Sequence, residues 1–458
     1  MTLTFRKLDF DFSEVIPLTF RKLNPDCSEV IPLTFRKLDL DFSEIISYNK
    51  QKEYIMYERT IAKRIKQIND TFRVLVLTGP RQVGKSTLLG SLAPDNMTKV
   101  SLDDLSLREL AKNDPRMFLE TYPAPLYIDE VQYAPELFPY IKMRVDVNSD
   151  RGQYWLSGSQ RFELMKNVTE SLAGRAGILN MNSFSYSEIQ RHADCEAFDP
   201  EHLRQRDTID VNRVFELIHA GGMPELYAVD GLDRDIFYDS YVKTYIERDV
   251  MHIKDIGSAR DFKRFMREMA IRVGMTLNYA DIAKEIGVSG HTIQSWLSIL
   301  ENTGLVYLLE AYSSNLLKRL TQSPKIIFMD MGLCAYLAGW QSARDLQLSD
   351  ASGHYLESYI ISEIVKNYQN LGVNAHLYHL RNKETNEIDL IIEKNNTFYP
   401  IEIKKTSTPR REMLKDFHIL EGVKSKLGKG GIVCTYDKLI PLDGNGNSVI
   451  PISSVIDL

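Results

Sequence analysis

Short apolar runs alternate with helical patterns in the first half of the chain. Residues 73–78, 125–128 and 153–156 are short and mostly apolar, which is typical of the buried strands of a parallel sheet. Isoleucines at helical spacing within residues 54–68 predict a helix with one apolar face ahead of the first run. Strands separated by helical patterns predict a parallel sheet with helices on both faces, and we expect this core to end near residue 200.

The second half changes from helical patterns to strands. Residues 211–272 are mostly helical in pattern, with a break at two glycines and a proline near residue 222. Two further helices at 279–286 and 290–302, with Ser289 as an N-cap and Gly304 as a stop, have the proportions of a helix-turn-helix. From about residue 352 a helix and then strands predict a separate α/β unit. These strands are expected at 375–380, 387–393, 397–404 and 431–435.

A repeat occupies the start of the chain. Three near-copies of one short unit begin at Leu3, Leu18 and Leu33. Recent duplication of a coding segment explains copies so alike, and three such units offer little core, so we expect residues 1–50 to be poorly structured. Apolar and polar positions alternate within each copy, which leaves open marginal strands that associate.

Composition narrows the class of protein. A chain of 458 residues is long enough for several domains, and 43% hydrophobic with 26% charged residues is an ordinary globular mixture. A net charge of −6 gives no overall positive field to attract nucleic acid or a membrane. The chain has no run long enough to span a membrane, no signal-peptide pattern and four widely spaced cysteines, so we expect a cytoplasmic protein with ordinary thiols.

A glycine-rich segment follows the first predicted strand and leads into a helical pattern. It reads GPRQVGKST and fits GxxxxGK[ST]. Its glycines let backbone amides turn toward phosphates, Lys85 can reach the terminal phosphates, and Ser86 can bind Mg²⁺. The sequence therefore predicts a nucleotide-binding loop. Its residues are Gly79, Pro80, Arg81, Gln82, Val83, Gly84, Lys85, Ser86 and Thr87.

Polar residues follow the next two predicted strands. Asp129 and Glu130 come directly after the second strand, at the edge where ligands bind in open α/β sheets. The aspartate can hold Mg²⁺, and the glutamate can orient and polarise the attacking water. Ser159 and Gln160 follow the third strand and are candidates for contact with the terminal phosphate. Arg175 could stabilise the transition state in its own subunit or a neighbouring one, or could be a surface arginine.

These motifs together resemble a group of predicted AAA-class ATPases of bacteria and archaea. The resemblance rests on GPRQVGKST, YIDEVQ, LSGSQ and ESLAGR in this order, and on the later stretches GGMPEL, YIERDV and KIIFMDMGLCAYLAG. It covers roughly residues 55 to 458. It implies ATP as the nucleotide, and it leaves open a homo-oligomer formed through Arg175. The residues that it implies are Lys85 and Ser86 for phosphate and Mg²⁺, Asp129 and Glu130 for metal and water, and Arg175 as the arginine finger.

The second helix of the predicted helix-turn-helix lacks the positive charge that would attract DNA. Residues 290–302 contain no Lys or Arg, while phosphate contacts supply much of the affinity for DNA. We therefore favour a winged-helix unit that packs within the protein. Weak DNA contacts by Thr292, Gln294 and Ser295 stay open. The side chains expected to pack inward are Ile293, Trp296, Leu297 and Leu300.

The C-terminal unit resembles PD-(D/E)xK nucleases. Glu357 lies on its helix, Asp389 lies in EIDLII, and Glu402 and Lys404 lie in PIEIKK. The period of two along a strand places Glu402 and Lys404 on one face. The three carboxylates could thus converge on Mg²⁺ with Lys404 near a scissile phosphate. The alternatives are a site that only binds and a charged strand that pairs with neighbouring basic residues.

The expected fold class is α/β, with an AAA-type P-loop core on a parallel sheet and a C-terminal restriction-endonuclease-like domain. The favoured function is Mg²⁺-dependent ATP hydrolysis that drives a conformational switch in the C-terminal domains, with DNA as a possible partner. The alternatives are an ATP-regulated, Mg²⁺-dependent DNA endonuclease and a nucleotide-stabilised interaction module without hydrolysis. The expected domains are the repeat at 1–50, the ATPase core at 51–205, a helical lid or linker at 206–275, a winged-helix-like region at 276–350 and the nuclease-like domain at 351–458.

Overall fold

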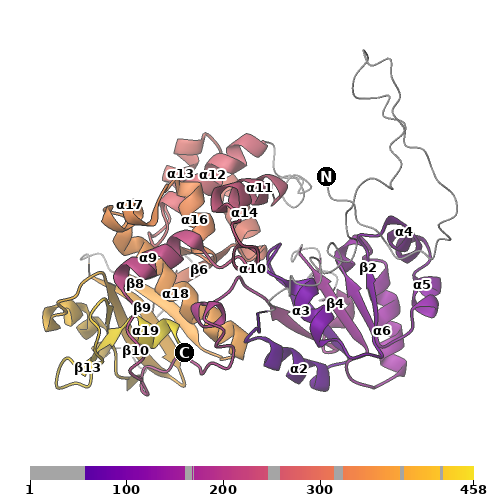
Figure 1. The fold of residues 1–458 in the computed structure, drawn as a ribbon, viewed down its shortest axis with the longest axis horizontal. Helices are drawn as coiled ribbons and strands as arrows, with labels where there is room; N and C mark the ends of the chain where they lie inside the picture. Colours follow the sequence, from indigo (N-terminus) through magenta and orange to yellow (C-terminus); the bar gives the residue numbers. More distant parts are fainter. Residues whose placement is uncertain are drawn as a thin grey trace, which may run out of the picture. The chain divides into compact units, whose positions relative to one another are not determined.

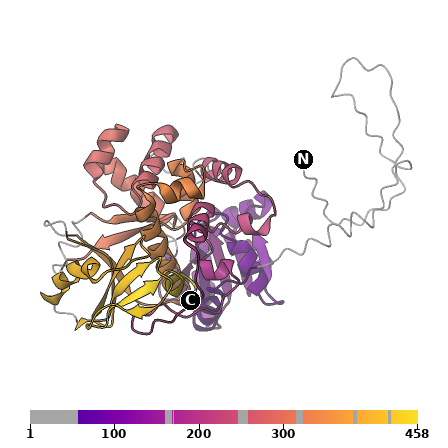
Figure 2. The ribbon, with the colours of Figure 1, turned by 60° about the vertical axis from the view of Figure 1, so that its left-hand side comes forward.

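The structure of the protein is a computed structural model. It describes residues 57–159, 164, 168, 170–245, 258–313, 323–381, 386–422 and 426–458. The described residues belong to one compact unit, residues 56–458, and their elements can be followed in Figures 1 and 2. The triplicated N-terminal segment lies outside the described residues, so its interpretation stays a prediction.

A five-stranded parallel sheet forms the first part of this unit. Its strands are β1 (Val74–Thr78), β2 (Thr98–Ser101), β3 (Leu126–Asp129), β4 (Tyr154–Gly158) and β5 (Ala176–Asn180). They lie in the order β2-β3-β4-β1-β5, with every neighbouring pair parallel. The apolar runs correctly predicted β1, β3 and β4. The runs missed β2 and β5, because these two edge strands expose part of their residues and so lack a continuous apolar pattern.

Helices cover both faces of this sheet, as the alternation of elements predicted (Figure 1). Leu75 and Leu77 of β1 enter one hydrophobic cluster with α2 and α3, whereas Val74 and Val76 enter a second cluster with α5 and α6. Both faces of β1 are therefore buried, which is why its sequence shows no alternation. The helices of this part are α2 (Ala62–Thr71), α3 (Lys85–Leu92), α4 (Leu105–Asn113), α5 (Pro115–Thr121), the 3-10 helix η2 (Val131–Tyr133), α6 (Leu137–Val147) and α8 (Tyr186–Ile189).

The middle of the chain is helical, and its helix-turn-helix has the predicted bounds. The Ser289 side chain accepts a hydrogen bond from the backbone N–H of Thr292 and so caps the second helix. The four apolar residues predicted to pack inward are all buried. The winged-helix interpretation itself stays a prediction. The helices are α9 (Val211–Ala220), α10 (Glu225–Ala228), α11 (Arg234–Tyr245), α12 (Ala259–Ile271), α13 (Tyr279–Ile286) and α14 (Gly290–Asn302).

A second, nine-stranded mixed sheet crosses the boundary expected at residue 350. Strands β6 (Val306–Ala311) and β7 (Lys325–Phe328) form an antiparallel pair after the helix-turn-helix, and β6 also pairs in parallel with β8 (His376–Arg381). The sheet runs β13-β14-β12-β10-β9-β8-β6-β7, with β11 beside β10. The winged-helix-like region and the C-terminal region therefore share one sheet.

Helices α16 to α18 connect β7 to the rest of this sheet. The 20-residue helix α18 (Ser352–Leu371) packs against β7 and β10, and nearly all of its side chains are buried, which explains why its amphipathic pattern is weak. The remaining elements are α16 (Met331–Ala338), α17 (Ala343–Leu348), β9 (Glu387–Lys394), β10 (Thr397–Lys404), the 3-10 helix η4 (Arg411–Gly422), β11 (Lys426–Leu427), β12 (Gly431–Cys434), β13 (Ile440–Pro441), β14 (Ser448–Pro451) and α19 (Ser453–Ile456).

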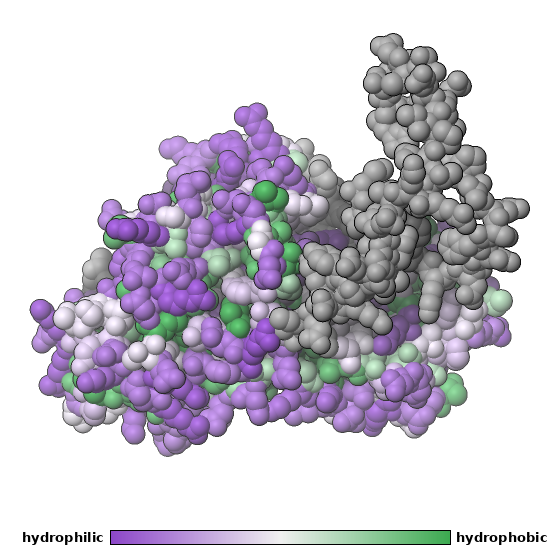
Figure 3. All heavy atoms as spheres, viewed as in Figure 1, coloured by the Kyte–Doolittle hydropathy of each residue, from purple (hydrophilic) through white to green (hydrophobic). Residues whose placement is uncertain are grey.

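The described surface is mostly polar on the face seen in Figure 3, with small separate hydrophobic patches. Among the described helices, none combines the length and the apolar character that a membrane crossing requires.

Candidate nucleotide site and carboxylate cluster

The glycine-rich loop joins the end of β1 to the start of α3, as predicted. Gly79 has a φ of +143°, and a Cβ there would lie 2.1 Å from the carbonyl oxygen of Met181, just beyond β5. Gly84 caps α3 with a left-handed φ of 90°. Both positions therefore require glycine, one for space and conformation and the other for conformation.

Lys85 and Ser86 open the helix that follows the loop. The Lys85 Nζ donates to the carbonyl oxygens of Gly79 and Pro80, at 2.8 and 2.6 Å, so this ammonium is folded back over the loop. Ser86 and Thr87 are exposed in the first turn of α3. A helix start with free backbone N–H groups, a hydroxyl and an ammonium is an anion-binding arrangement suited to phosphates.

A chain of hydroxyl groups ends at Asp129, one of the two predicted Mg²⁺ ligands. The Tyr127 hydroxyl lies 2.9 Å from the Ser157 Oγ. Ser157 donates to Asp129 at the end of β3. Burial, reinforced by the negative charge of Asp129, raises the pKa of Tyr127 well above its usual value, so this phenol stays protonated. Because β4 lies between β1 and β3, Ser157 bridges the loop strand and the carboxylate strand.

Glu130 adopts a left-handed backbone conformation directly after β3, with a φ of 54°. Its carboxylate accepts hydrogen bonds from the Gln132 amide and, at 3.3 Å, from the Ser159 hydroxyl. Ser159, predicted from its place after the third strand, is thus beside Glu130. Gln160, the other candidate there, lies outside the described residues. The structure therefore brings Glu130, Asp129 and the loop to one edge of the sheet, with neutral partners on both carboxylates.

Arg175 lies at the opposite edge of the sheet. It directly precedes β5, which runs parallel to β1, so it is at the N-terminal end of the strands while the loop is at their C-terminal end. Its Nε and Nη2 donate to the two carboxylate oxygens of Asp146, at 2.5 and 3.0 Å. In this structure Arg175 therefore lies away from the loop, and its action, in its own subunit or in a neighbouring one, stays a prediction.

A buried arginine that the motifs did not indicate connects the loop to the segment after β5. Arg59 Nη1 donates to the carbonyl oxygen of Val83 in the loop at 2.8 Å. Its Nη2 donates to the carbonyl oxygen of Asn182 at 2.7 Å, and its Nε pairs with Glu188 at 3.1 Å. The guanidinium also lies 4.7 Å from the ring centroid of Phe184. We call residues 182–188 the joint.

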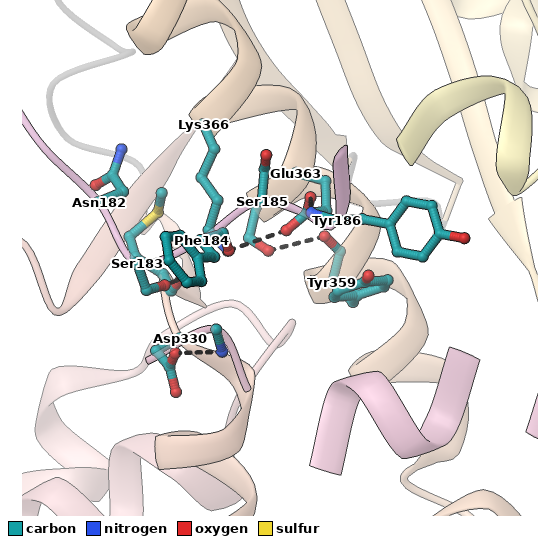
Figure 4. Close-up of polar contacts among 12 residues, drawn as sticks. Asn182, Ser183, Phe184, Ser185, Tyr186, Asp330, Tyr359, Glu363 and Lys366 are labelled. Carbon is teal, nitrogen blue, oxygen red and sulfur yellow. Dashed lines mark hydrogen bonds and ion pairs between the residues drawn. The ribbon is translucent and has the colours of Figure 1, made fainter. Parts of the chain in front are cut away.

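The joint is bound in turn to helix α18 (Figure 4). The Lys366 Nζ donates to the carbonyl oxygen of Phe184 at 2.9 Å, and the backbone N–H of Tyr186 donates to Glu363 at 2.7 Å. The Asn182 amide donates to Gln369 at 2.7 Å. These bonds link the joint to the C-terminal half of α18 at several successive turns.

The N-terminal half of α18 carries the first residue of the predicted nuclease set. Glu357, Asp389 of β9 and Glu402 of β10 are all buried and lie in one cluster with Lys404. The Lys404 Nζ lies 2.9 Å from Asp389 and 2.7 Å from Glu402. The structure therefore brings all four predicted residues together, although the nuclease-like fold as a whole stays a prediction.

A lysine that no sequence motif indicated lies inside this cluster. Lys325, the first residue of β7, is 2% exposed. Its Nζ is 2.7 Å from Glu357 and 2.7 Å from Glu387, and 3.9 Å from Asp389. The one sequence signal for it is a lysine at the head of the apolar run KIIF, which fits a strand whose first side chain enters a polar pocket.

Burial controls the ionisation of these carboxyl groups. It raises the pKa of Glu357 to about 8 and that of Glu402 to about 9, with further contributions from the charge of Asp389. Burial opposes ionisation of Asp389 too, but Lys404, Lys325 and the backbone N–H of Ile403 outweigh it and hold its pKa below the usual value. Burial and the charge of Asp389 therefore oppose ionisation of Glu357 and Glu402, while the ammonium groups of Lys325 and Lys404 favour it.

The cluster does not fit Mg²⁺ as it stands. Among the described residues, one group of His, Cys, Asp and Glu side chains brings three ligand atoms within 4.8 Å of one another, and it consists of Asp199, Glu201 and His202. Glu357, Asp389 and Glu402 do not form such a group, and lysine ammonium groups lie within ion-pair distance of each of them.

Three stretches of the chain match known families. Residues 71–190 match the AAA domain family. Residues 211–344 match a domain of unknown function, DUF8612, and residues 352–455 match another, DUF4143. The AAA match spans β1 to β5 and contains the loop, Asp129 and Glu130, so the matched residues hold the candidate nucleotide site.

Two relatives of this chain are described as uncharacterised proteins. An uncharacterised protein of Mycobacterium tuberculosis strain H37Rv is 28% identical over 359 residues, which is 78% of this chain and 75% of the relative. An uncharacterised protein of Haemophilus influenzae is 20% identical over 364 residues, 74% of this chain and 84% of the relative.

Solved structures give distant likenesses. The Walker-type ATPase of Pyrococcus abyssi is 13% identical, with a TM-score of 0.39 over 62% of this chain and 97% of that one. The RuvB Holliday junction branch migration motor of Thermotoga maritima is 19% identical, with a TM-score of 0.27 over 54% of this chain and 88% of that one.

Proposed function

We propose that this protein binds Mg²⁺-ATP at residues 79–87, hydrolyses it with Asp129 and Glu130, and transmits the change to its C-terminal half. The C-terminal half, which includes α18 and the nine-stranded sheet, is the responding part of an ATP-driven switch. The observation that carries the proposal is the Arg59 guanidinium, because one buried group binds both the loop and the joint.

The loop residues have defined tasks in this proposal. Lys85 leaves the carbonyl oxygens of Gly79 and Pro80 and reaches the terminal phosphates, while the N-terminus of α3 holds their charge. Ser86 and Asp129 fit Mg²⁺, because one is an exposed hydroxyl and the other a half-buried carboxylate with neutral partners. When bound, Mg²⁺ would neutralise phosphate charge.

Glu130 is the candidate general base. Gln132 and Ser159 hold its carboxylate, and neither neutralises it. A carboxylate fixed by neutral donors can orient a water molecule and accept its proton as that water attacks the terminal phosphate. Ser159 therefore acts through Glu130, as a positioning residue.

Two contacts of the loop support transmission to the rest of the unit. A shift of the Val83 carbonyl oxygen would displace the Arg59 guanidinium bound to it, and Arg59 in turn contacts Glu188 and Asn182 of the joint. Pro80 lies against Gly304, where α14 turns into β6, since a Cβ at Gly304 would be 3.1 Å from the Pro80 Cδ. Because interiors are close-packed, a shift of the loop at these points displaces its neighbours.

The test is phosphate release by the full chain, measured for wild type and for Glu130→Gln. We expect steady hydrolysis by the wild type and a loss of about 100-fold to 10,000-fold in Glu130→Gln, with ATP binding retained in calorimetry. Glu136→Gln is the matched control, because Glu136 is an exposed carboxylate nearby whose side chain makes no cap hydrogen bond.

The same assay separates the remaining candidates. ATP binding without phosphate release would exclude the hydrolytic proposal and leave the interaction module. Repeating the assay with single-stranded and double-stranded DNA tests the DNA partner. Stimulation would support DNA as the client of the switch, and indifference would point to a protein client.

A further inference from the structure

Lys325 joins two parts of the molecule inside the carboxylate cluster. It comes from β7, which follows the helix-turn-helix, whereas Glu357 lies on α18 and Glu387 and Asp389 lie on β9. At 2% exposure its ammonium is almost removed from water. A buried charge of this kind is stable only when it is paired, and Glu357 and Glu387, each at 2.7 Å, supply the pairing.

Each carboxylate of the predicted metal set has a lysine within ion-pair distance. Glu357 has Lys325, while Asp389 and Glu402 share Lys404. Mg²⁺ requires oxygen ligands in a near-octahedral shell and loses its water reluctantly. A Mg²⁺ ion bound between these carboxylates would lie beside the buried Lys325 ammonium. Two neighbouring positive charges repel strongly in a protein interior, where little water screens them.

We propose that Lys325 is the internal cation of this cluster and that the cluster does not take up a divalent metal. The positive charge that Mg²⁺ would supply to Glu357 and Asp389 comes from the side chain of Lys325. The C-terminal unit then has the residue set of a nuclease without its metal, and the cluster serves to tie α18 to β7 and β9. This inference does not depend on the ATP site.

The proposal gives α18 two fixed ends. Glu363, Lys366 and Gln369 bind the joint at one end, and Glu357 binds Lys325 at the other. Because the ion pairs of Glu357 involve no metal ion, the position of α18 would not change with the metal concentration.

The test uses Mn²⁺ alone as a probe, titrated into nucleotide-free full-length protein and followed by the paramagnetic relaxation of water. At millimolar Mn²⁺ we expect the wild type to show no Mn²⁺-binding site that is lost in Glu402→Gln. Lys325→Met removes the ammonium and keeps much of the side-chain volume, so we expect it to gain one Mn²⁺ site, which the double variant Lys325→Met, Glu402→Gln loses. Lys325→Arg keeps the charge and should stay without a site.

Two results would overturn the proposal. One is Mn²⁺ binding by the wild type that disappears in Glu402→Gln, and this result needs no Lys325 variant to fold. The other is a folded Lys325→Met, verified by its circular dichroism and melting transition, that still binds no Mn²⁺. Both are distinct from failure of the ATPase proposal, because the titration contains no nucleotide.

Discussion

The nucleotide loop and the Lys325 cluster use the same kinds of residue in opposite ways. Each combines a buried lysine with acidic side chains. In the loop, Lys85 is held by backbone carbonyl oxygens, and Asp129 and Glu130 are held by hydroxyl and amide groups. In the cluster, Lys325 and Lys404 are held by the carboxylates themselves.

The partners of a charged group decide whether its charge stays available to a ligand. Neutral partners orient a charged group without cancelling it, so the loop can still compensate a triphosphate and its metal. In an ion pair, the two charges neutralise each other within the protein. Removing one partner leaves the other as an unpaired buried charge, which is strongly unfavourable. The partners of a charged residue therefore say more about ligand binding than its membership in a motif.

Replacing Lys325 should give the largest effect on stability. Lys325→Ala leaves Glu357 and Glu387 without their buried counter-ion, so we expect a loss of about 3 to 5 kcal/mol in the free energy of unfolding, measured by urea denaturation. Lys63→Ala is the control, because its pair with Asp194 is exposed on both sides and exposed pairs contribute little. Equal small losses in both variants would show that the cluster is not an internally paired site.

Replacing Arg59 tests whether the nucleotide loop is coupled to the joint and to α18. Arg59→Lys keeps the charge but loses the fork that reaches Val83, Asn182 and Glu188 together, and we expect a destabilisation of about 2 kcal/mol. We also expect wild-type α18 to change its hydrogen exchange when ATP binds, and the variant to lose most of that change. Arg144→Lys is the control, since Arg144 binds a carbonyl oxygen of Leu119 away from the joint. An ATP response that survives intact in Arg59→Lys would contradict transmission through Arg59.

Sequence patterns predicted what depends on near neighbours along the chain. The loop, the strand before it and the bounds of α13, α14 and β10 follow from spacing, glycine conformation and capping within a few residues. The convergence of Glu357, Asp389 and Glu402 followed from a resemblance, and the structure brings them together.

Long-range contacts account for what the patterns did not predict. Lys325 pairs with Glu357, which is 32 residues away in the sequence. Arg59 pairs with Glu188, which is 129 residues away. A lysine or arginine at a helix or strand end is ordinarily solvated, so only tertiary packing shows that these two are buried. The edge strands β2 and β5 were missed for a related reason, because their burial depends on which strand lies beside them.

A histidine near the cluster predicts a pH dependence of stability. Burial, and secondarily the charge of Lys325, lowers the pKa of His379 to about 4 in the folded state, against about 6.5 when unfolded. Because the unfolded chain takes up this proton first as pH falls, stability is lost below pH 6.5, by about 2 kcal/mol between pH 7 and pH 5. Urea denaturation at several pH values should show a shallower acid loss in His379→Gln.

His291→Gln, at an exposed position of α14, is the control for this measurement. It should leave the acid dependence as in the wild type. An unchanged slope in His379→Gln as well would show that Lys325 and burial do not hold His379 neutral.

Replacing Arg175 should give the smallest effect of these substitutions. Its guanidinium is bound by both oxygens of Asp146 at the far edge of the sheet, so in this structure it lies away from the loop. We expect Arg175→Ala to change ATP turnover by less than about twofold, since surface substitutions away from a site usually cost little. Turnover should be measured over a range of protein concentrations. A fall of about 1,000-fold, at concentrations where the wild type gains activity by association, would instead make Arg175 a finger for a neighbouring subunit.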